Sequence, residues 1–122
     1  MTKGPVMPSI EKLTDDIRQF AEERDWEQFH SPKNLSMALA VEACEIMEIF
    51  QWLTQEQSKN LSEEKMTELK YELADVTIYV VRLADKLGID LLSATKEKMA
   101  KNRKKYPADK VRGSAKKYNE YD

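Results

Sequence analysis

Apolar residues recur every three or four positions through most of the chain, a spacing typical of amphipathic helices that bury one face. The first such segment is predicted to form a helix from about Ser9 to Phe29, with Ser9 as its N-cap. Its apolar stripe consists of Ile10, Leu13, Ile17, Phe20 and Ala21.

A second helix is predicted from about Pro32 to Leu53. Ser31 followed by proline is a strong start signal, because serine caps a helix and proline is tolerated in the first turn. The apolar stripe of this helix consists of Leu35, Leu39, Ile46, Ile49 and Leu53. A polar linker, TQEQSKN at 54–60, follows it.

Two more helices complete the pattern. Ser62 caps the third, which is predicted to reach Leu87, where Gly88 is a natural C-terminal stop. Asp90 caps the fourth, which is expected to end before Pro107. Because no alternating strand pattern occurs, the sequence predicts an all-α four-helix bundle with short connections.

The chain has 122 residues, of which 41% are hydrophobic, a size and composition that suit one compact domain. We expect a flexible N-terminal segment at 1–8, a helical domain at 9–107 and an extended tail at 108–122. No apolar run approaches the roughly 20 residues that cross a bilayer, and the N-terminus lacks the apolar core of a secretory signal. A cytoplasmic protein is predicted, with its single cysteine, Cys44, as a small buried filler.

Two pairs of carboxylates interrupt these apolar stripes. Glu42 falls in the middle of the stripe of the second helix, and Glu45 lies on its flank. In the third helix, Glu72 lies at the edge of the stripe and Asp75 next to it. Both pairs have the spacing i, i+3, which places their members on one face of a helix. The third stripe consists of Leu69, Val76, Val80, Leu83 and Leu87.

Carboxylates turned toward a helix interface need a positive partner, because burial and mutual repulsion both oppose their ionisation. Lys65 and Lys86 lie about two helical turns or more from the acids of the third helix. A divalent cation is the better partner, and oxygen-only ligands favour Mg²⁺, with Mn²⁺ as the alternative. A di-iron site is disfavoured because it normally uses Glu-x-x-His motifs, and the only histidine is His30. The competing interpretation places the acids in solvent at the stripe edge.

Positive charge is concentrated near the C-terminus. Residues 96–117 contain ten Lys or Arg against two acids, a local balance of +8 in a chain whose net charge is −2. Such a cluster can indicate an anionic partner, but by itself it favours a solvated helix face with a loose tail. The negative net charge argues against a general nucleic-acid binder.

These motifs resemble a known family. Glu42-x-x-Glu45 followed by Glu72-x-x-Asp75 is similar to the metal motif of the all-α MazG-type nucleoside triphosphate pyrophosphohydrolases. FAEERDWEQFH (20–30), FQW (50–52), ELADVTIY (72–79) and KMAKNRKKYP (98–107) resemble the dCTP pyrophosphatase branch, so the resemblance covers about residues 10–118. One position departs from the pattern, because Val41 precedes Glu42 where many members have a second glutamate.

The resemblance implies hydrolysis of a (deoxy)nucleoside triphosphate to the monophosphate and pyrophosphate, in the service of nucleotide-pool cleaning. It also implies Mg²⁺ held by Glu42, Glu45, Glu72 and Asp75, and a homodimer or a homotetramer. Glu42 and Glu45 are both candidates for the general base that takes a proton from the attacking water. Neither a membrane nor stable nucleic-acid binding is expected.

By the same resemblance, a nucleobase slot is built from the segment at 26–30 together with Trp52 and Tyr79. The tryptophans would stack on the base, whereas Gln28 or His30 would read its edge. Each aromatic taken singly is more often a core residue than a ligand. Donors spaced along the fourth helix are expected to contact phosphate oxygens. The predicted substrate-binding residues are Trp26, Gln28, Phe29, His30, Trp52, Tyr79, Lys98, Asn102 and Arg103.

Two alternatives stay open at this point. One is a non-enzymatic helical module with a structural metal ion and a basic tail that binds nucleic acid. The other keeps the enzyme but changes its base preference to dUTP or a damaged nucleotide.

Overall fold

The computed structural model describes residues 8–115, and within this range every regular element is helical, which confirms the all-α prediction. The described chain divides after Ile89 into two compact units. The first contains α1 (Ile10–Glu23), the 3₁₀ helix η1 (Glu27–Phe29), α2 (Pro32–Phe50), α3 (Gln55–Ser58) and α4 (Glu63–Lys86). The second contains α5 (Leu91–Lys105) and α6 (Ala108–Val111).

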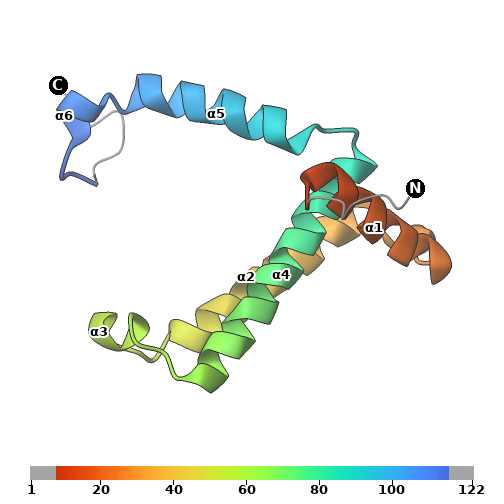
Figure 1. Ribbon diagram of the computed structural model, residues 1–122, viewed down its shortest axis with the longest axis horizontal. Helices are drawn as coiled ribbons and strands as arrows, with labels where there is room; N and C mark the ends of the chain where they lie inside the picture. The colour runs from red at the N-terminus through yellow and green to blue at the C-terminus, as the bar shows by residue number, and fades with distance from the viewer. Residues whose placement is uncertain (1–7, 116–122) are drawn as a thin grey trace, which may run out of the picture. The chain divides into compact units, whose positions relative to one another are not determined.

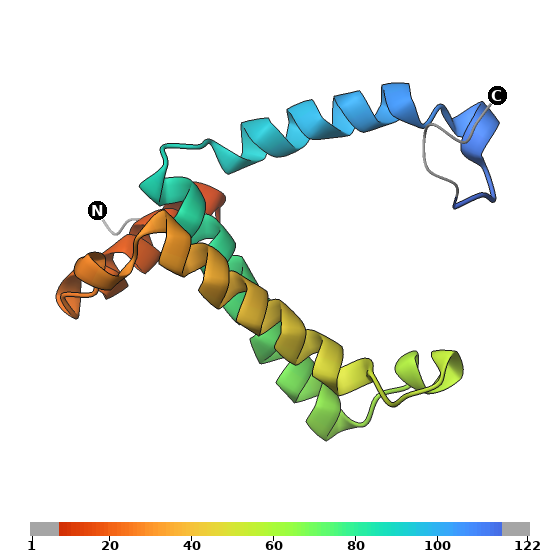
Figure 2. The same cartoon turned by 180° about the vertical axis from the view of Figure 1, so that it is seen from behind.

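Helices α2 and α4 form an antiparallel pair that runs through the first unit, and α1 packs on α4 (Figures 1 and 2). The fully buried apolar side chains of the described residues are Ala21, Leu35, Val81 and Ala84. Most other members of the predicted stripes on α2 and α4 are half-buried, as expected for a two-helix interface. Leu87 is an exception, with 55% of its surface exposed beyond the end of α4. The fully buried core of the unit therefore lies where α1 meets the α2–α4 pair.

Cys44 is exposed, so its predicted role as a buried filler is wrong. It lies two residues after Glu42 and two before Ile46, and a two-residue step turns a helix by about 200°. Cys44 therefore faces away from the side of α2 that contacts α4.

The predicted N-caps are confirmed at all four long helices. In each case the side-chain oxygen of the cap accepts a hydrogen bond from a backbone N–H three residues later, at 3.0 to 3.2 Å. These bonds satisfy donors that have no partner within the helix. The four caps are Ser9, Ser31, Ser62 and Asp90.

The first helix is shorter than predicted, because α1 ends at Glu23 and the chain re-enters a helical conformation only in η1. Asp25 adopts a left-handed conformation with φ 55°. Its N–H donates to the carbonyl of Glu22, and the N–H of Trp26 donates to that of Ala21. These are the two bonds of a Schellman motif, with aspartate where glycine is commoner. Sequence periodicity does not register such an ending.

The second helix also ends earlier than predicted, at Phe50 rather than Leu53. The linker expected at 54–60 contains the short helix α3, which begins with a capping box in which Thr54 and Gln57 bond reciprocally. The stop at Gly88 is confirmed: its φ is 65°, and the N–H of Ile89 bonds to the carbonyl of Ala84.

The second unit consists of α5, which ends at Lys105 before Pro107 as predicted, and α6. Helix α6 lies in a segment that was expected to be extended. Residues 1–7 of the expected N-terminal segment and 116–122 of the expected tail lie outside the described residues. Of the helices in residues 8–115, none is both long and apolar enough to cross a membrane.

Candidate metal centre

Three of the four predicted metal ligands converge between α2 and α4. One carboxylate oxygen from each of Glu42, Glu45 and Glu72 lies within 4.8 Å of the others. All three side chains are half-buried. The antiparallel helix pair thus brings two carboxylates of α2 to one carboxylate of α4 at mid-length. An ion held by several oxygen atoms needs ligands at this kind of separation.

Two of these carboxylates have an oxygen that lacks any partner. Oε2 of Glu42 and Oε2 of Glu72 are both inaccessible to solvent and accept no hydrogen bond. Buried carboxylate oxygens without a donor are unfavourable, so they are rare in native proteins unless an ion or water satisfies them. This observation distinguishes the group from an ordinary solvated acidic patch, and it fits a hard divalent cation.

Electrostatics at the cluster favours protonation when no cation compensates the charge. Burial, followed by hydrogen bonds with Glu45 and Glu72, raises the pKa of Glu42 to about 7. A hydrogen bond with Glu45, followed by burial, raises the pKa of Glu72 above its usual range. Both shifts favour the protonated form, because a neutral carboxyl can donate its proton to a neighbouring carboxylate, whereas ionised carboxylates lose hydration at the helix interface and repel one another.

Asp75, the fourth predicted ligand, lies one turn further along α4 and is half-buried. Its charge contributes to the raised pKa of both Glu42 and Glu72, although Asp75 is not one of the three converging carboxylates. The structure therefore places Asp75 beside the cluster, and its role as a ligand stays a prediction.

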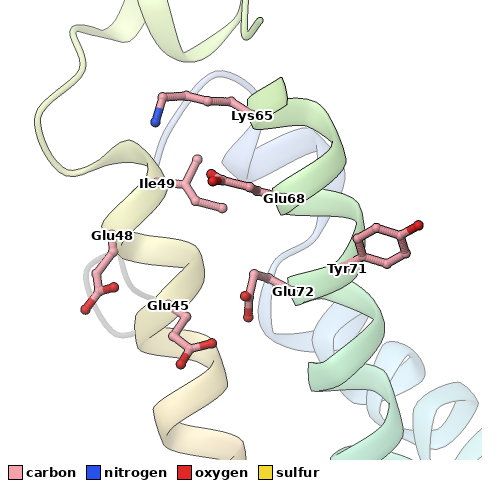
Figure 3. Close-up of a pocket in the computed structure, with 7 residues that line it drawn as sticks. All are labelled: Glu45, Glu48, Ile49, Lys65, Glu68, Tyr71 and Glu72. Carbon is pink, nitrogen blue, oxygen red and sulfur yellow. The ribbon is translucent and has the colours of Figure 1, made fainter. Parts of the chain in front are cut away.

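An open pocket of about 550 Å³ adjoins the cluster between α2 and α4 (Figure 3). Glu45 and Glu72 point into the space between the two helices, whereas the ring of Tyr71 points away from α2. Four of the lining residues are acidic and one is basic, so the pocket has a strongly negative potential. The lining residues are Glu45, Glu48, Ile49, Lys65, Glu68, Tyr71 and Glu72.

The segment predicted to bind the nucleobase lies at the other end of α4. Trp26 contacts the ring of His30 with a centroid distance of 6.2 Å and that of Phe20 at 5.6 Å. Nδ1 of His30 accepts a hydrogen bond from Nε of Arg82 at 3.2 Å. The amide of Gln28 donates to the backbone oxygen of Asp25 at 3.0 Å. The segment is therefore ordered by its own contacts and by α4.

The remaining predicted binding residues are more dispersed. Trp52 is 86% exposed and follows the end of α2, and Phe29 is 59% exposed on η1. Tyr79 is half-buried on α4, one turn beyond Asp75. Lys98, Asn102 and Arg103 lie on α5 in the second unit, where the two basic side chains are exposed. Their predicted contacts with substrate stay predictions.

The buried guanidinium of Arg82 is a feature that the sequence does not predict. Among the described residues it is the one charged side chain that is buried, with 2% of its surface exposed. It contacts Glu27 and His30 of the segment at 26–30 and Asp85 of its own helix, α4. The i, i+3 spacing of Arg82 and Asp85 was the only sequence signal, and that spacing is common on solvated helices.

The fold and the site together define an all-α protein with a cluster of carboxylates that could hold a cation between two antiparallel helices. Residues 37–121 match the MazG-like family, and the chain belongs to that family.

Curated relatives and a solved structure agree with this assignment. The chain is 44% identical to dCTP pyrophosphatase 1 of Bos taurus, over 96% of this chain and 73% of the bovine protein. It is 45% identical to dCTP pyrophosphatase 1 of Homo sapiens, over 92% of this chain and 69% of the human protein. A crystal structure of a pyrophosphatase from Archaeoglobus fulgidus superposes with a TM-score of 0.78 at 36% identity, covering 87% of this chain and 99% of that one.

The raised pKa of Glu42 predicts how pH affects stability when divalent ions are removed. Because the folded-state pKa is about 7 and the ordinary value is 4.5, the folded protein must ionise Glu42 against repulsion as the pH rises through 7. The wild type should therefore lose stability relative to Glu42→Gln between about pH 4.5 and 7, and the variant should be the more stable at pH 8.

Urea unfolding in a chelating buffer at several pH values measures this difference. Excess Mg²⁺ at pH 8 should remove the advantage of the variant, because the ion compensates the charge. Glu64→Gln, at the exposed first turn of α4, is the matched control and should show no such trend. A stability difference between wild type and Glu42→Gln that does not change with pH would contradict the assignment.

Proposed function

We propose that this protein hydrolyses a nucleoside triphosphate, dCTP or a modified dCTP, to the monophosphate and pyrophosphate with Mg²⁺, or Mn²⁺ in its place. The observation that carries the proposal is the pair of buried, unpartnered oxygens on Glu42 and Glu72 beside Glu45. Membership of the MazG-like family and the similarity to dCTP pyrophosphatase 1 support the reaction and the base.

Glu42, Glu45 and Glu72 would hold the metal ion, with Asp75 as a fourth ligand from the next turn of α4. When bound, the ion supplies Lewis-acid chemistry, because it neutralises phosphate charge and makes a water molecule more acidic. A carboxylate that is not fully used as a ligand then accepts the proton of the attacking water. Glu42 and Glu45 are the candidates for this base.

The charge of the pocket explains why a cation is required for binding as well as for hydrolysis. Glu48 and Glu68 extend the acidic surface beyond the cluster, and Lys65 is the only basic residue in the lining. A triphosphate is a polyanion and would be repelled by this surface on its own. The substrate would therefore enter as a metal complex.

The base and the distal phosphates would be recognised by groups outside the acidic pocket. Trp26, Phe29 and Trp52 offer aromatic faces for a flat ring, and Gln28 and His30 offer polar edges. Tyr79 lies on α4 between Asp75 and Arg82, which contacts the segment at 26–30, whereas Trp52 follows the opposite end of α2. Lys98, Asn102 and Arg103 of α5 carry the donors proposed for phosphate oxygens.

The reaction can be tested by incubating the protein with Mg²⁺ and separating the products by chromatography. We expect dCTP to yield dCMP and pyrophosphate, and a panel of triphosphates that includes dUTP and modified cytosine nucleotides should rank a cytosine nucleotide first. Release of orthophosphate instead would contradict cleavage between the α and β phosphates. Unchanged dCTP together with salt-sensitive DNA binding would favour the non-enzymatic alternative.

Glu72→Gln removes a charge from the cluster while keeping the size of the side chain. It should lower the rate of pyrophosphate release by about 100-fold or more, because the metal loses a charged ligand. The circular dichroism of the helices should be unchanged. Glu64→Gln on the same helix is the control and should keep wild-type turnover, whereas wild-type turnover in Glu72→Gln would refute the metal assignment.

We also propose that the protein associates with copies of itself as a dimer or a tetramer. Large apolar side chains are exposed along α2 and α4, and monomeric proteins rarely expose so many. Light scattering after size exclusion should give at least twice the chain mass of 14.2 kDa. A single-chain mass at every concentration would contradict self-association. The exposed residues include Met37, Val41, Met47, Met66, Leu73 and Ile78.

A further inference from the structure

The buried side chain of Arg82 connects two parts of the first unit. Its guanidinium remains charged at any ordinary pH, so its burial requires charged or polar partners. Nη2 bonds to Glu27, Nε donates to Nδ1 of His30 at 3.2 Å, and Nη1 donates to Asp85 at 3.3 Å. Two of the three partners thus belong to the segment that follows α1, and the third lies on α4.

The partners of Arg82 are themselves held in place. Asp85 accepts two hydrogen bonds from Arg18 of α1, at 2.6 and 2.9 Å. Glu27 also bonds to Lys86, and its contacts with Lys86 and Arg82 lower its pKa below the usual range. These residues therefore join α1, η1 and α4 through charged contacts. Arg82, its partners Glu27, His30 and Asp85, and the two cations that contact those partners, Arg18 and Lys86, are called the Arg82 cluster.

Apolar burial covers the segment at 26–30 only in part. Trp26 is 41% exposed and Phe29 is 59% exposed, and neither Gln28 nor any other side chain of the segment is buried. The contacts that attach this segment to α4 are the bonds of Glu27 and His30. Charged bonds with little exposure to water fix geometry more strictly than exposed apolar contacts do.

Helix α4 carries both this attachment and the metal ligands. Arg82 lies ten residues after Glu72, which is about 15 Å along the axis of one continuous helix. Accepting at Nδ1 also leaves the proton of neutral His30 on Nε2, so that the imidazole retains an N–H donor. The acceptors on the Watson–Crick edge of cytosine are groups that such a donor can bind.

We propose that Arg82 is a positioning residue that holds the segment at 26–30 on α4 and fixes His30 as a hydrogen-bond donor for the nucleobase. The proposal rests on the proposed function, since it assigns a role in base recognition. It assigns Arg82 no contact with the phosphates or the metal ion. Loss of Arg82 should therefore weaken substrate binding and reduce selectivity for the base, while hydrolysis continues.

Steady-state kinetics of Arg82→Gln and Arg82→Lys with dCTP test this role. KM should rise by about tenfold or more in both, because lysine cannot reproduce the forked contacts, while kcat stays within about threefold of the wild type. The ratio of kcat/KM for dCTP to kcat/KM for other triphosphates should fall. Arg18→Gln is the matched control: it removes two hydrogen bonds to Asp85 but none to residues 26–30, so its KM should rise far less than that of Arg82→Gln.

A second readout follows the single histidine of the chain by NMR. Burial and the charge of Arg82 lower the pKa of His30, with Glu27 opposing and Lys86 adding to that effect. The pKa of His30 should therefore rise in Arg82→Gln and stay unchanged in Arg18→Gln. If Arg82→Gln does not fold, Glu27→Gln removes the partner from the other side and should raise KM in the same direction.

The outcomes separate the two proposals. An inactive wild type would refute the proposed function. An active wild type with an unchanged KM and unchanged base preference in folded Arg82→Gln would refute the positioning role. A fall in kcat alone, equal in Arg82→Gln and Arg18→Gln, would also refute it, because that result indicates a general loss of stability.

Discussion

The packing of α2 on α4 in the first unit requires that the repulsion between the carboxylates they bring together be relieved. The two helices form its main packing interface, yet Glu42, Glu45 and Glu72 converge within it, and two of their oxygens have no partner. Either protonation or a cation must relieve this repulsion. Because burial and the neighbouring carboxyl groups raise the pKa of Glu42, a bound ion would both order the site and strengthen the helix pair.

Near the C-terminal end of α4, a buried charge is compensated by protein groups alone. There the buried charge is positive, and Glu27 and Asp85 compensate it directly while neutral His30 accepts a hydrogen bond. The acidic cluster has two buried oxygens without a partner, whereas each nitrogen of the Arg82 guanidinium has one. The unpartnered oxygens make the acidic cluster a candidate ion-binding site, whereas the paired Arg82 cluster attaches the segment at 26–30 to α4. One continuous helix, α4, thus connects the candidate cation site to the segment at 26–30 that is proposed to bind the base.

Local signals predicted helix starts well because each depends on a few adjacent atoms. The capping oxygens of Ser31 and Ser62 bond three residues ahead, which sequence spacing alone specifies. Helix ends were harder to predict. The Schellman ending at Asp25 uses a left-handed aspartate that resembles any other polar residue in a sequence, so α1 was predicted too long.

The sequence by itself determined the all-α class, the helix starts and the two acidic pairs, because these follow from periodicity and spacing within single helices. Only the tertiary structure decided that Glu42, Glu45 and Glu72 meet while Asp75 lies beside them, since convergence depends on how two helices are placed side by side. It also revealed Arg82, whose partners at Glu27 and His30 lie more than fifty residues earlier in the chain. Contacts at such separations leave no periodic trace in a sequence, and packing alone creates them.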